Sequence, residues 1–178
     1  MIEGTLVNLR AHDLDDLERN HRWLNDRDVM RFLTSRYQYS LMAEEAWMRE
    51  HTLKQPSYAN ASFAIVTKDG RHIGNTGLHH GSPEDRACDL GIMIGEKDCW
   101  GRGYGTDALR TLVGFAFDEM NMNRVELDVY AFNERAIRSY EKAGFILEGV
   151  RRQDMYRYGE YIDIVMMALL RSDWEAAR

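Results

Sequence analysis

A glycine-rich turn that leads into a long amphipathic helix constrains the fold of this sequence most strongly. The turn, Trp100-Gly-Arg-Gly-Tyr-Gly-Thr106, follows a stretch at 87–95 that alternates like a strand. Apolar residues then recur at helical spacing over 105–120. Glycine has no Cβ, so the backbone can bend and approach a ligand, and the N–H groups of the first helical turn attract an anion. The sequence therefore predicts a strand–turn–helix unit that binds a phosphate group, with Arg102 as a further charged donor.

The same turn also fits a dinucleotide-binding fingerprint. Residues 103–108 match G-x-G-x-x-A. Glu126 or Asp128 follows at about the separation along the sequence that is expected for an acid that binds a ribose. However, residues 96–100 separate the glycines from the strand, and several antiparallel-looking strands come first. The P-loop pattern is absent because no Gly-Lys-Ser/Thr follows. This context disfavours a nucleotide-dependent oxidoreductase, which remains the third hypothesis.

Hydrophobic periodicity predicts the rest of the architecture. Asp69-Gly70 and Tyr158-Gly159 indicate turns between paired strands. We expect strands at 6–9, 62–67, 71–80, 87–95, 124–130, 145–156 and 161–170, and helices near 13–24, 43–53, 105–120 and 133–143. Seven strands with about four inserted helices predict an α+β fold around a central mixed, largely antiparallel sheet. A length of 178 residues suits a single domain over 1–178, with its core at about 5–171.

Composition excludes several other classes. A net charge of −6 argues against a nucleic-acid binder and favours cationic partners such as amines. The longest apolar run, 164–170, is far shorter than the roughly 20 residues that span a bilayer, and the N-terminus does not read as a signal peptide. The isolated Cys88 and Cys99 fit buried thiols in a reducing cytoplasm. We expect no metal site, because His79 and His80 point to opposite faces of a strand and no further ligand cluster is evident.

A second motif lies about thirty residues after the glycine turn. Residues 133–145 have the form N-x-x-A-x-x-x-Y-x-x-x-G-F. This motif and the glycine turn together resemble the GNAT family of N-acetyltransferases, and the resemblance covers nearly the whole chain. Trp23-Leu-Asn-Asp26, with Val29 and Leu33, is similar to the branch that contains ribosomal-protein N-terminal acetyltransferases and polyamine acetyltransferases. The resemblance implies a GNAT-like sheet and an acetyl-CoA-dependent acyltransferase.

The resemblance also implies where acetyl-CoA binds. The cofactor is expected in a splayed gap between strands 87–95 and 124–130, with its pantetheine on backbone groups and its pyrophosphate on the glycine turn. The implied cofactor-binding residues are Met93, Ile94, Arg102, Gly103, Tyr104, Gly105, Thr106, Asn133 and Ala136. Many family members carry Gln or Arg where this chain has Trp100, so a side-chain contact from that position is not expected. Asn133 is equally a favoured helix N-cap without any ligand.

The implied catalytic residues are Tyr140, Asp128 and Asp89. Tyr140 is expected near the thioester sulfur as a general acid, because a phenol with a pKa of about 10 is protonated at neutral pH. Its alternative role is that of a core tyrosine. Asp128 and Asp89 are alternative general bases, and each is equally well explained as a structural or water-binding carboxylate.

The sequence favours direct attack of a primary amine on the thioester in a ternary complex. A covalent intermediate is disfavoured because neither cysteine stands at a motif position. A protein N-terminal amine is the preferred acceptor, since its pKa of about 7.7–8.0 demands little base. A polyamine or an amino sugar is the alternative acceptor, and a non-catalytic acyl-CoA-binding module is the alternative function. The resemblance is also compatible with a homodimer.

Overall fold

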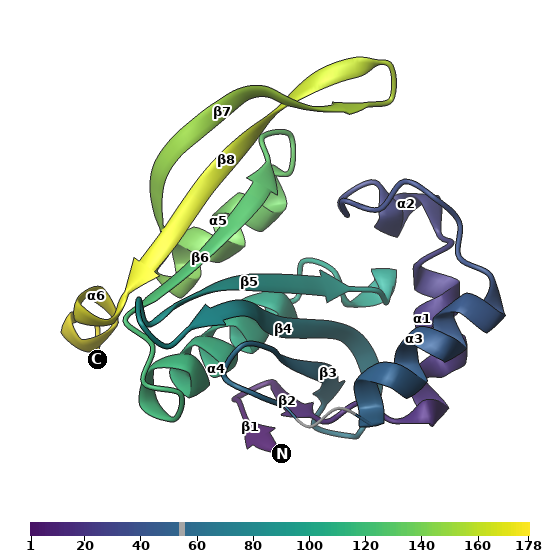
Figure 1. Cartoon of the computed structure of the whole chain (residues 1–178), viewed down its shortest axis with the longest axis horizontal. Coiled ribbons are helices and arrows are strands. Elements are labelled where there is room, and N and C mark those ends of the chain that lie inside the picture. The colour runs from purple at the N-terminus through teal and green to yellow at the C-terminus, as the bar shows by residue number, and fades with distance from the viewer. Residues whose placement is uncertain (54–55) are drawn as a thin grey trace.

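The computed structural model describes residues 1–53 and 56–178, and the side chains of 1–50 and 56–178. Its strands form one sheet in the order β1-β2-β3-β4-β5-β6-β8-β7 (Figure 1). The strands are β1 (Ile2–Glu3), β2 (Val7–Arg10), β3 (Ala61–Thr67), β4 (His72–Ser82), β5 (Ala87–Ile94), β6 (Arg124–Tyr130), β7 (Ile146–Arg157) and β8 (Glu160–Leu170). The helices are α1 (Leu17–Trp23), α2 (Arg27–Met30), α3 (Leu41–Leu53), α4 (Tyr104–Asp118), α5 (Glu134–Ala143) and α6 (Arg171–Ala176), with short 3-10 helices at Leu14–Asp16 and Lys97–Cys99.

This arrangement confirms the α+β fold with a mixed, largely antiparallel sheet, because only β5 and β6 pair in parallel. The predicted count of seven strands was too low by one for the described residues, since Ile2–Glu3 adds β1 at the edge beside β2. The predicted four helices likewise omitted α2 and α6. These elements have two, four and six residues, which is too short for hydrophobic periodicity to be recognised.

The main core lies between the sheet and the helices α4 and α5. Leu109, Leu112 and Phe117 of α4 are fully buried, as their helical spacing predicts. They belong to one apolar cluster with Leu90 of β5 and Leu127 of β6. Because side chains alternate along a strand, the residues next to these two face away from α4 and α5. The opposite face of β5 and β6 therefore presents acidic side chains, namely Asp89, Glu126 and Asp128.

The sheet splits between β5 and β6. The two strands pair only where Ala87–Asp89 meets Arg124–Glu126, and they then diverge toward Ile94 and Tyr130 (Figure 1). By contrast, β6 stays paired with β8 along its whole length. The hairpin of β7 and β8 consequently leans away together with β6, and the divergence opens a wedge at the carboxyl ends of two parallel strands.

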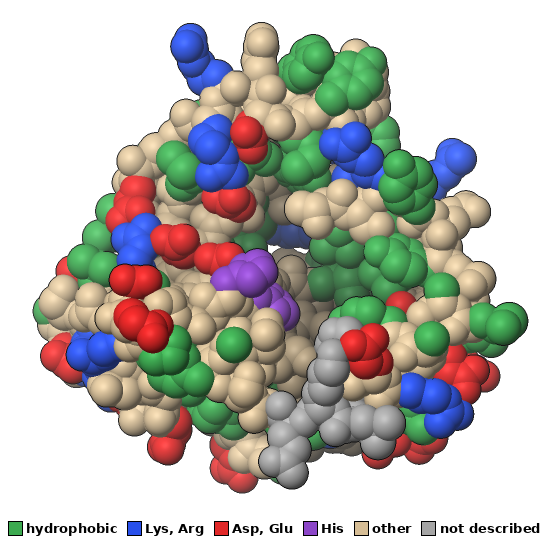
Figure 2. Space-filling view, viewed as in Figure 1, with side chains coloured by type: hydrophobic (Ala, Val, Ile, Leu, Met, Phe, Trp, Pro, Cys, Tyr) green, Lys and Arg blue, Asp and Glu red, His purple; other side chains and the backbone are tan. Residues whose placement is uncertain are grey.

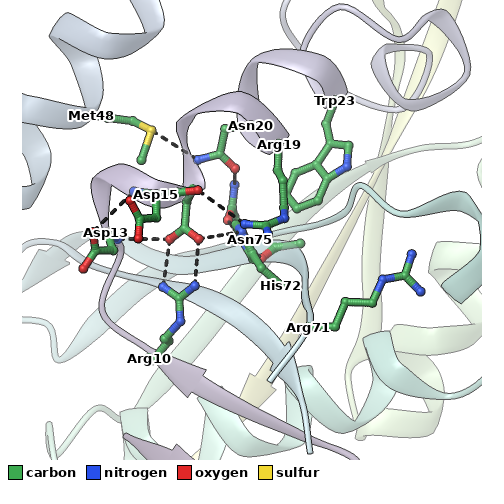
Figure 3. A network of polar contacts seen from close by, with 12 residues as sticks. Arg10, Asp13, Asp15, Arg19, Asn20, Trp23, Met48, Arg71, His72 and Asn75 are labelled. Atoms are coloured by element: carbon green, nitrogen blue, oxygen red, sulfur yellow. Dashed lines mark hydrogen bonds and ion pairs between the residues drawn. The ribbon is translucent and has the colours of Figure 1, made fainter. Parts of the chain in front are cut away.

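A buried polar network attaches the first helices to the sheet (Figure 3). Asp16 is fully buried and accepts two hydrogen bonds from the Arg10 guanidinium, at 2.7 and 2.8 Å. His72 of β4 places Nδ1 at 2.9 Å from the Asp16 carboxylate, and its Nε2 lies 2.9 Å from the Gly74 carbonyl oxygen. Trp23 of α1 contacts the His72 ring edge-on. This network fixes the position of α1 beside the wedge. Within 1–53 and 56–178, no helix has the length and apolarity needed to cross a membrane.

Candidate active site

The wedge between β5 and β6 forms a cleft of about 860 Å³. Its walls come from β5, the glycine turn, β6, α5, the hairpin of β7 and β8, and the residues after α2. In the face shown in Figure 2, the hollow has acidic, basic and histidine side chains along one side. The cleft lies where the carboxyl ends of parallel strands separate, which is the usual position of a ligand site in such sheets.

The charged side chains that line the cleft differ in sign between helix α5 and the strands. Helix α5 contributes three cations, Arg135, Arg138 and Lys142. The strands contribute five carboxylates and two arginines, which are Asp89, Glu126, Asp128, Glu148, Asp154, Arg124 and Arg151. The wall formed by α5 therefore suits an anionic ligand, whereas the strand wall carries an excess of three negative charges and suits a cationic one.

The glycine turn ends in a helix N-terminus that no side chain caps. Gly103 is the N-cap of α4 with φ +86°, a left-handed conformation that glycine adopts without strain. It has no Cβ, so the first-turn amides of Tyr104 and Gly105 are not screened by a capping side chain. Thr106 lies 2.6 Å, oxygen to oxygen, from Ser139 of α5, and this contact holds the turn against the second motif.

Most of the predicted cofactor-binding residues line the cleft. These are Met93, Ile94, Gly103, Gly105, Thr106, Asn133 and Ala136. Arg102 is exposed and does not line the cleft, and Tyr104 packs against the apolar core instead. Asn133 caps α5, because its side-chain oxygen accepts the N–H of Ala136 at 3.3 Å.

Trp100 blocks part of the open edge of β5. Its indole N–H donates to the Ile94 carbonyl oxygen at 2.7 Å. The N–H of Gly95 bonds to Ile73 of β4, so alternation turns the backbone groups of Ile94 toward the cleft and those of Met93 toward β4. The contact expected at Ile94 must therefore use its N–H group, since its carbonyl is already engaged.

Tyr140 lies in the last turn of α5 and lines the cleft. Only 8% of its surface is exposed, and its ring packs edge-on against Phe145 at 6.0 Å. Burial raises the pKa of Tyr140 to about 12. The Tyr140 hydroxyl forms no hydrogen bond with the residues that the structure describes. The phenol is therefore protonated at neutral pH, with its donor free to meet a ligand.

Both predicted bases line the cleft, and each carboxylate is engaged by a neighbouring side chain. The Asp128 carboxylate is paired with Arg151, which also bonds Asp154 at 3.1 Å. Asp89 lies across the wedge and is hydrogen-bonded to His80, with 2.7 Å between the carboxylate oxygen and Nδ1. Asp128 and Asp89 face the same side of the sheet. Neither carboxylate is a free base in this arrangement.

Sequence reasoning missed Arg135, the second residue of α5. Its guanidinium lies 4.1 Å from the centre of the Trp100 ring and 5.2 Å from that of Phe32. Burial lowers the pKa of Arg135, and it forms no ion pair with any described carboxylate. An arginine that lines a cleft and stacks on aromatic rings can bind a phosphate. Its place two residues after the Asn133 cap was the only sequence clue.

These features agree with comparisons to known proteins. Residues 6–146 match the family model described as an acetyltransferase (GNAT) domain, so the chain belongs to the GNAT acetyltransferase family. YjcK of Bacillus subtilis, named as an N-acetyltransferase, is 37% identical over 98% of this chain and 99% of its own length. YdaF of the same organism, whose name assigns it a ribosomal N-acetyltransferase activity, is 34% identical over 70% of this chain and 68% of its own length.

A solved structure supports the fold. The spermidine N-acetyltransferase of Vibrio cholerae in complex with CoA and spermine superposes with a TM-score of 0.86 at 24% identity, over 96% of this chain and 98% of the other. Enzymes of the GNAT family take their acetyl group from acetyl-CoA, so this chain is an acetyl-CoA-dependent N-acetyltransferase.

Proposed function

We propose that this enzyme transfers the acetyl group of acetyl-CoA directly to the α-amine at a protein or peptide N-terminus. The observation that carries this proposal is that both candidate bases are engaged: Asp128 is ion-paired with Arg151, and Asp89 is hydrogen-bonded to His80. With no free carboxylate base, the site favours an amine that is already partly neutral. At pH 7, an α-amine with a pKa near 8 costs roughly 1.4 kcal/mol to deprotonate, whereas a lysine-like amine near 10.4 costs roughly 4.6 kcal/mol.

The residues of the cleft fit acetyl-CoA. Gly103, Gly105 and the first turn of α4 offer backbone donors for the pyrophosphate, and Arg135 offers a charged donor nearby. The N–H of Ile94 and the side-chain nitrogen of Asn133 are the groups available to the pantetheine arm. The acetyl-CoA thioester supplies the activated acetyl group.

The reaction is a single displacement. The amine nitrogen forms a bond to the thioester carbonyl carbon, the bond from that carbon to sulfur breaks, and the nitrogen releases its proton to solvent. Tyr140 donates a hydrogen bond to the departing sulfur, and the thiolate then takes up a proton from solvent to leave as the CoA thiol. Full proton transfer from a phenol of pKa about 12 to a thiolate of pKa about 8.5 is uphill by roughly 5 kcal/mol, so the hydrogen bond carries most of the effect.

Direct transfer is also supported by the raised pKa values of the two cysteine thiols. Burial raises the pKa of Cys88 to about 12, and the pKa of Cys99 is raised for the same reason. A thiol with a raised pKa is a poor nucleophile at neutral pH, because the thiolate is the reactive form. The raised pKa values of both thiols therefore disfavour an acetyl-cysteine intermediate.

A polyamine is the second candidate acceptor. The excess negative charge of the strand wall favours it, because carboxylates attract a polycation. A relative that is 25% identical over 94% of this chain is named as the spermidine N(1)-acetyltransferase of Vibrio cholerae. However, Arg124 and Arg151 occupy the same wall and would repel additional ammonium groups.

CoA-thiol release from acetyl-CoA, measured at pH 7 with four acceptors, tests this proposal. The acceptors are a lysine-free peptide with a free α-amine, an N-terminally blocked peptide with one lysine, spermidine and glucosamine. We expect the highest kcat/KM with the free α-amine, and a rise in the relative rate with spermidine toward pH 9.5. A preference for spermidine at pH 7 would overturn the peptide acceptor in favour of the polyamine. Tight acetyl-CoA binding with no release from any amine would instead indicate a non-catalytic module.

A further inference from the structure

The residues that follow α2 cross the open end of the cleft. Phe32, Leu33 and Thr34 line it. On the β5 side, the Phe32 ring meets the Trp100 ring edge-on, with 6.1 Å between centroids. On the other side, the main chain of this segment is held by residues of β6 and β7. We call residues 30–35 the crossing segment, because they join the two halves of the split sheet.

Arg157, the last residue of β7, holds the crossing segment. Its side chain reaches four main-chain carbonyls, and only 7% of its surface is exposed. The donor–acceptor distances are 2.7 Å to Leu33, 3.0 Å to Ser35, 3.3 Å to Thr34 and 3.3 Å to Met30. Arg157 forms no ion pair with the carboxylates that the structure describes.

A buried cation without a carboxylate depends on its hydrogen bonds. Burying an unpaired charge is costly unless each donor has an acceptor. The carbonyls of the crossing segment supply these acceptors, so Arg157 and the segment can only be buried together. Tyr130 of β6 adds a second connection, because its hydroxyl donates to the Leu33 carbonyl at 3.1 Å.

We propose that Arg157 is a positioning residue for the acceptor amine: it fixes the crossing segment as the outer wall of the acceptor end of the cleft. This inference rests on the proposed transferase function. The acetyl-CoA contacts named above lie on the glycine turn, α4, α5 and β5, and none of them is on β7. Among them, Arg135 meets the crossing segment at the Phe32 ring, but its closer contact, 4.1 Å to the Trp100 ring, does not involve the segment. Loss of Arg157 should therefore loosen the acceptor wall and leave the acetyl-CoA site intact.

A purely structural role makes a different prediction. If Arg157 only stabilised the fold, its replacement would lower the melting temperature without changing the Michaelis constant of one substrate selectively. A positioning role requires a rise in the acceptor KM with an unchanged acetyl-CoA Kd. It also requires that the main chain of the crossing segment becomes accessible to a protease. Trypsin cleaves after arginine, and the side chains of Arg31 and Arg36 are already exposed, so the cleavage rate at these residues reports the release of the main chain.

The test compares Arg157→Gln with Arg152→Gln. Arg152 is an exposed arginine on the same strand, with no contact to another described side chain, so its replacement removes the same charge. With the α-amine peptide and spermidine as probes, we expect Arg157→Gln to raise the acceptor KM at least tenfold, with the acetyl-CoA Kd within twofold. Cleavage after Arg31 or Arg36 should become at least tenfold faster. An unchanged KM and cleavage rate in folded Arg157→Gln would overturn the proposal.

Two milder variants decide the matter if Arg157→Gln does not fold. Tyr130→Phe removes one hydrogen bond to Leu33, and Arg157→Lys keeps the charge but has fewer donors. Each should raise the cleavage rate and the acceptor KM two- to fivefold, and no change in either would contradict the proposal. If the unmodified enzyme acetylates no amine, the proposed function fails. The cleavage rates then still report whether Arg157 holds the segment.

Discussion

The carboxylate of Asp107, in the first turn of α4, accepts the backbone N–H of Leu6 at 2.7 Å. The same oxygen accepts the N–H of Val7 at 2.9 Å, so one side chain ties the start of β2 to the helix that follows the glycine turn. The other carboxylate oxygen accepts the N–H of Thr5 at 3.3 Å. We expect Asp107→Ala to lower the free energy of unfolding by about 2–3 kcal/mol, since all three hydrogen bonds to this carboxylate are lost. Urea denaturation measures this change. Asp118→Ala is the control, because this carboxylate pairs with Arg178 at the surface and should cost less than about 0.5 kcal/mol.

Replacing Tyr140 by phenylalanine tests its place at the sulfur. We expect Tyr140→Phe to lower kcat on the order of ten- to a hundredfold, because the hydrogen bond to the departing thiolate is lost. The acetyl-CoA Kd should stay within twofold. With a pKa of about 12, Tyr140 should not deprotonate below about pH 11, so kcat should show no alkaline decline from this group. An unchanged kcat would remove Tyr140 from the mechanism.

A methyl group at Gly103 should obstruct the phosphate site. Gly103→Ala places a Cβ on a residue with φ +86°, at a cost of about 1 kcal/mol in stability. Gly159 in the hairpin turn has φ +88° and open space around it, so Gly159→Ala should cost the same stability. Only Gly103→Ala should weaken acetyl-CoA binding, by about tenfold, in isothermal titration calorimetry. Equal affinities in the two variants would refute the placement of the pyrophosphate.

Arg135 should contribute to binding through the phosphates of acetyl-CoA. We expect Arg135→Gln to weaken acetyl-CoA binding about five- to twentyfold, because a charged donor is lost. S-acetylpantetheine has no phosphate, and its affinity should not change. Arg36→Gln removes an exposed arginine outside the cleft lining and serves as the control in the same titration. Equal losses for both ligands would place Arg135 elsewhere than at a phosphate.

The buried Asp16 should make stability depend on acidic pH. Burial opposes its charged form, yet hydrogen bonds from Arg10 and His72 hold the pKa of Asp16 well below its usual range. Its stabilisation is therefore complete above the pKa of an unfolded aspartate, about 3.9, and is lost as the pH falls below that value. Asp16→Asn should cost about 3–5 kcal/mol at pH 7, and the difference from the unmodified protein should shrink toward pH 2.

Urea midpoints at pH 7, 5, 4 and 3 measure the effect of Asp16→Asn. Asp15→Asn is the control, because this neighbouring carboxylate is exposed and forms no side-chain hydrogen bond with the described residues. Its difference from the unmodified protein should stay below about 0.5 kcal/mol at each pH. A pH-independent difference for Asp16→Asn would show that Asp16 does not carry the acid sensitivity.

Hydrophobic periodicity and capping residues along the chain were sufficient to predict much of the fold. The alternation in 124–130 and the helical spacing in 105–120 predicted β6 and α4 nearly to the residue, because long periodic elements bury a regular apolar face. The cap at Asn133 and the glycine stop at Gly144 bounded α5 in the same way. The two-residue β1 could not be predicted, since pairing with β2 alone makes it a strand.

Residue order alone encodes the two motifs, the succession of the long elements and hence the family. The folded chain was needed to show that Asp128 is paired with Arg151, that Asp89 is hydrogen-bonded to His80 and that Arg135 stacks on Trp100. It also showed that Arg157 reaches Leu33 across the cleft. The physical reason is that periodicity and capping act between neighbours along the chain. These pairings join residues 9 to 124 positions apart, and the divergence of β5 from β6 sets the cleft that they surround.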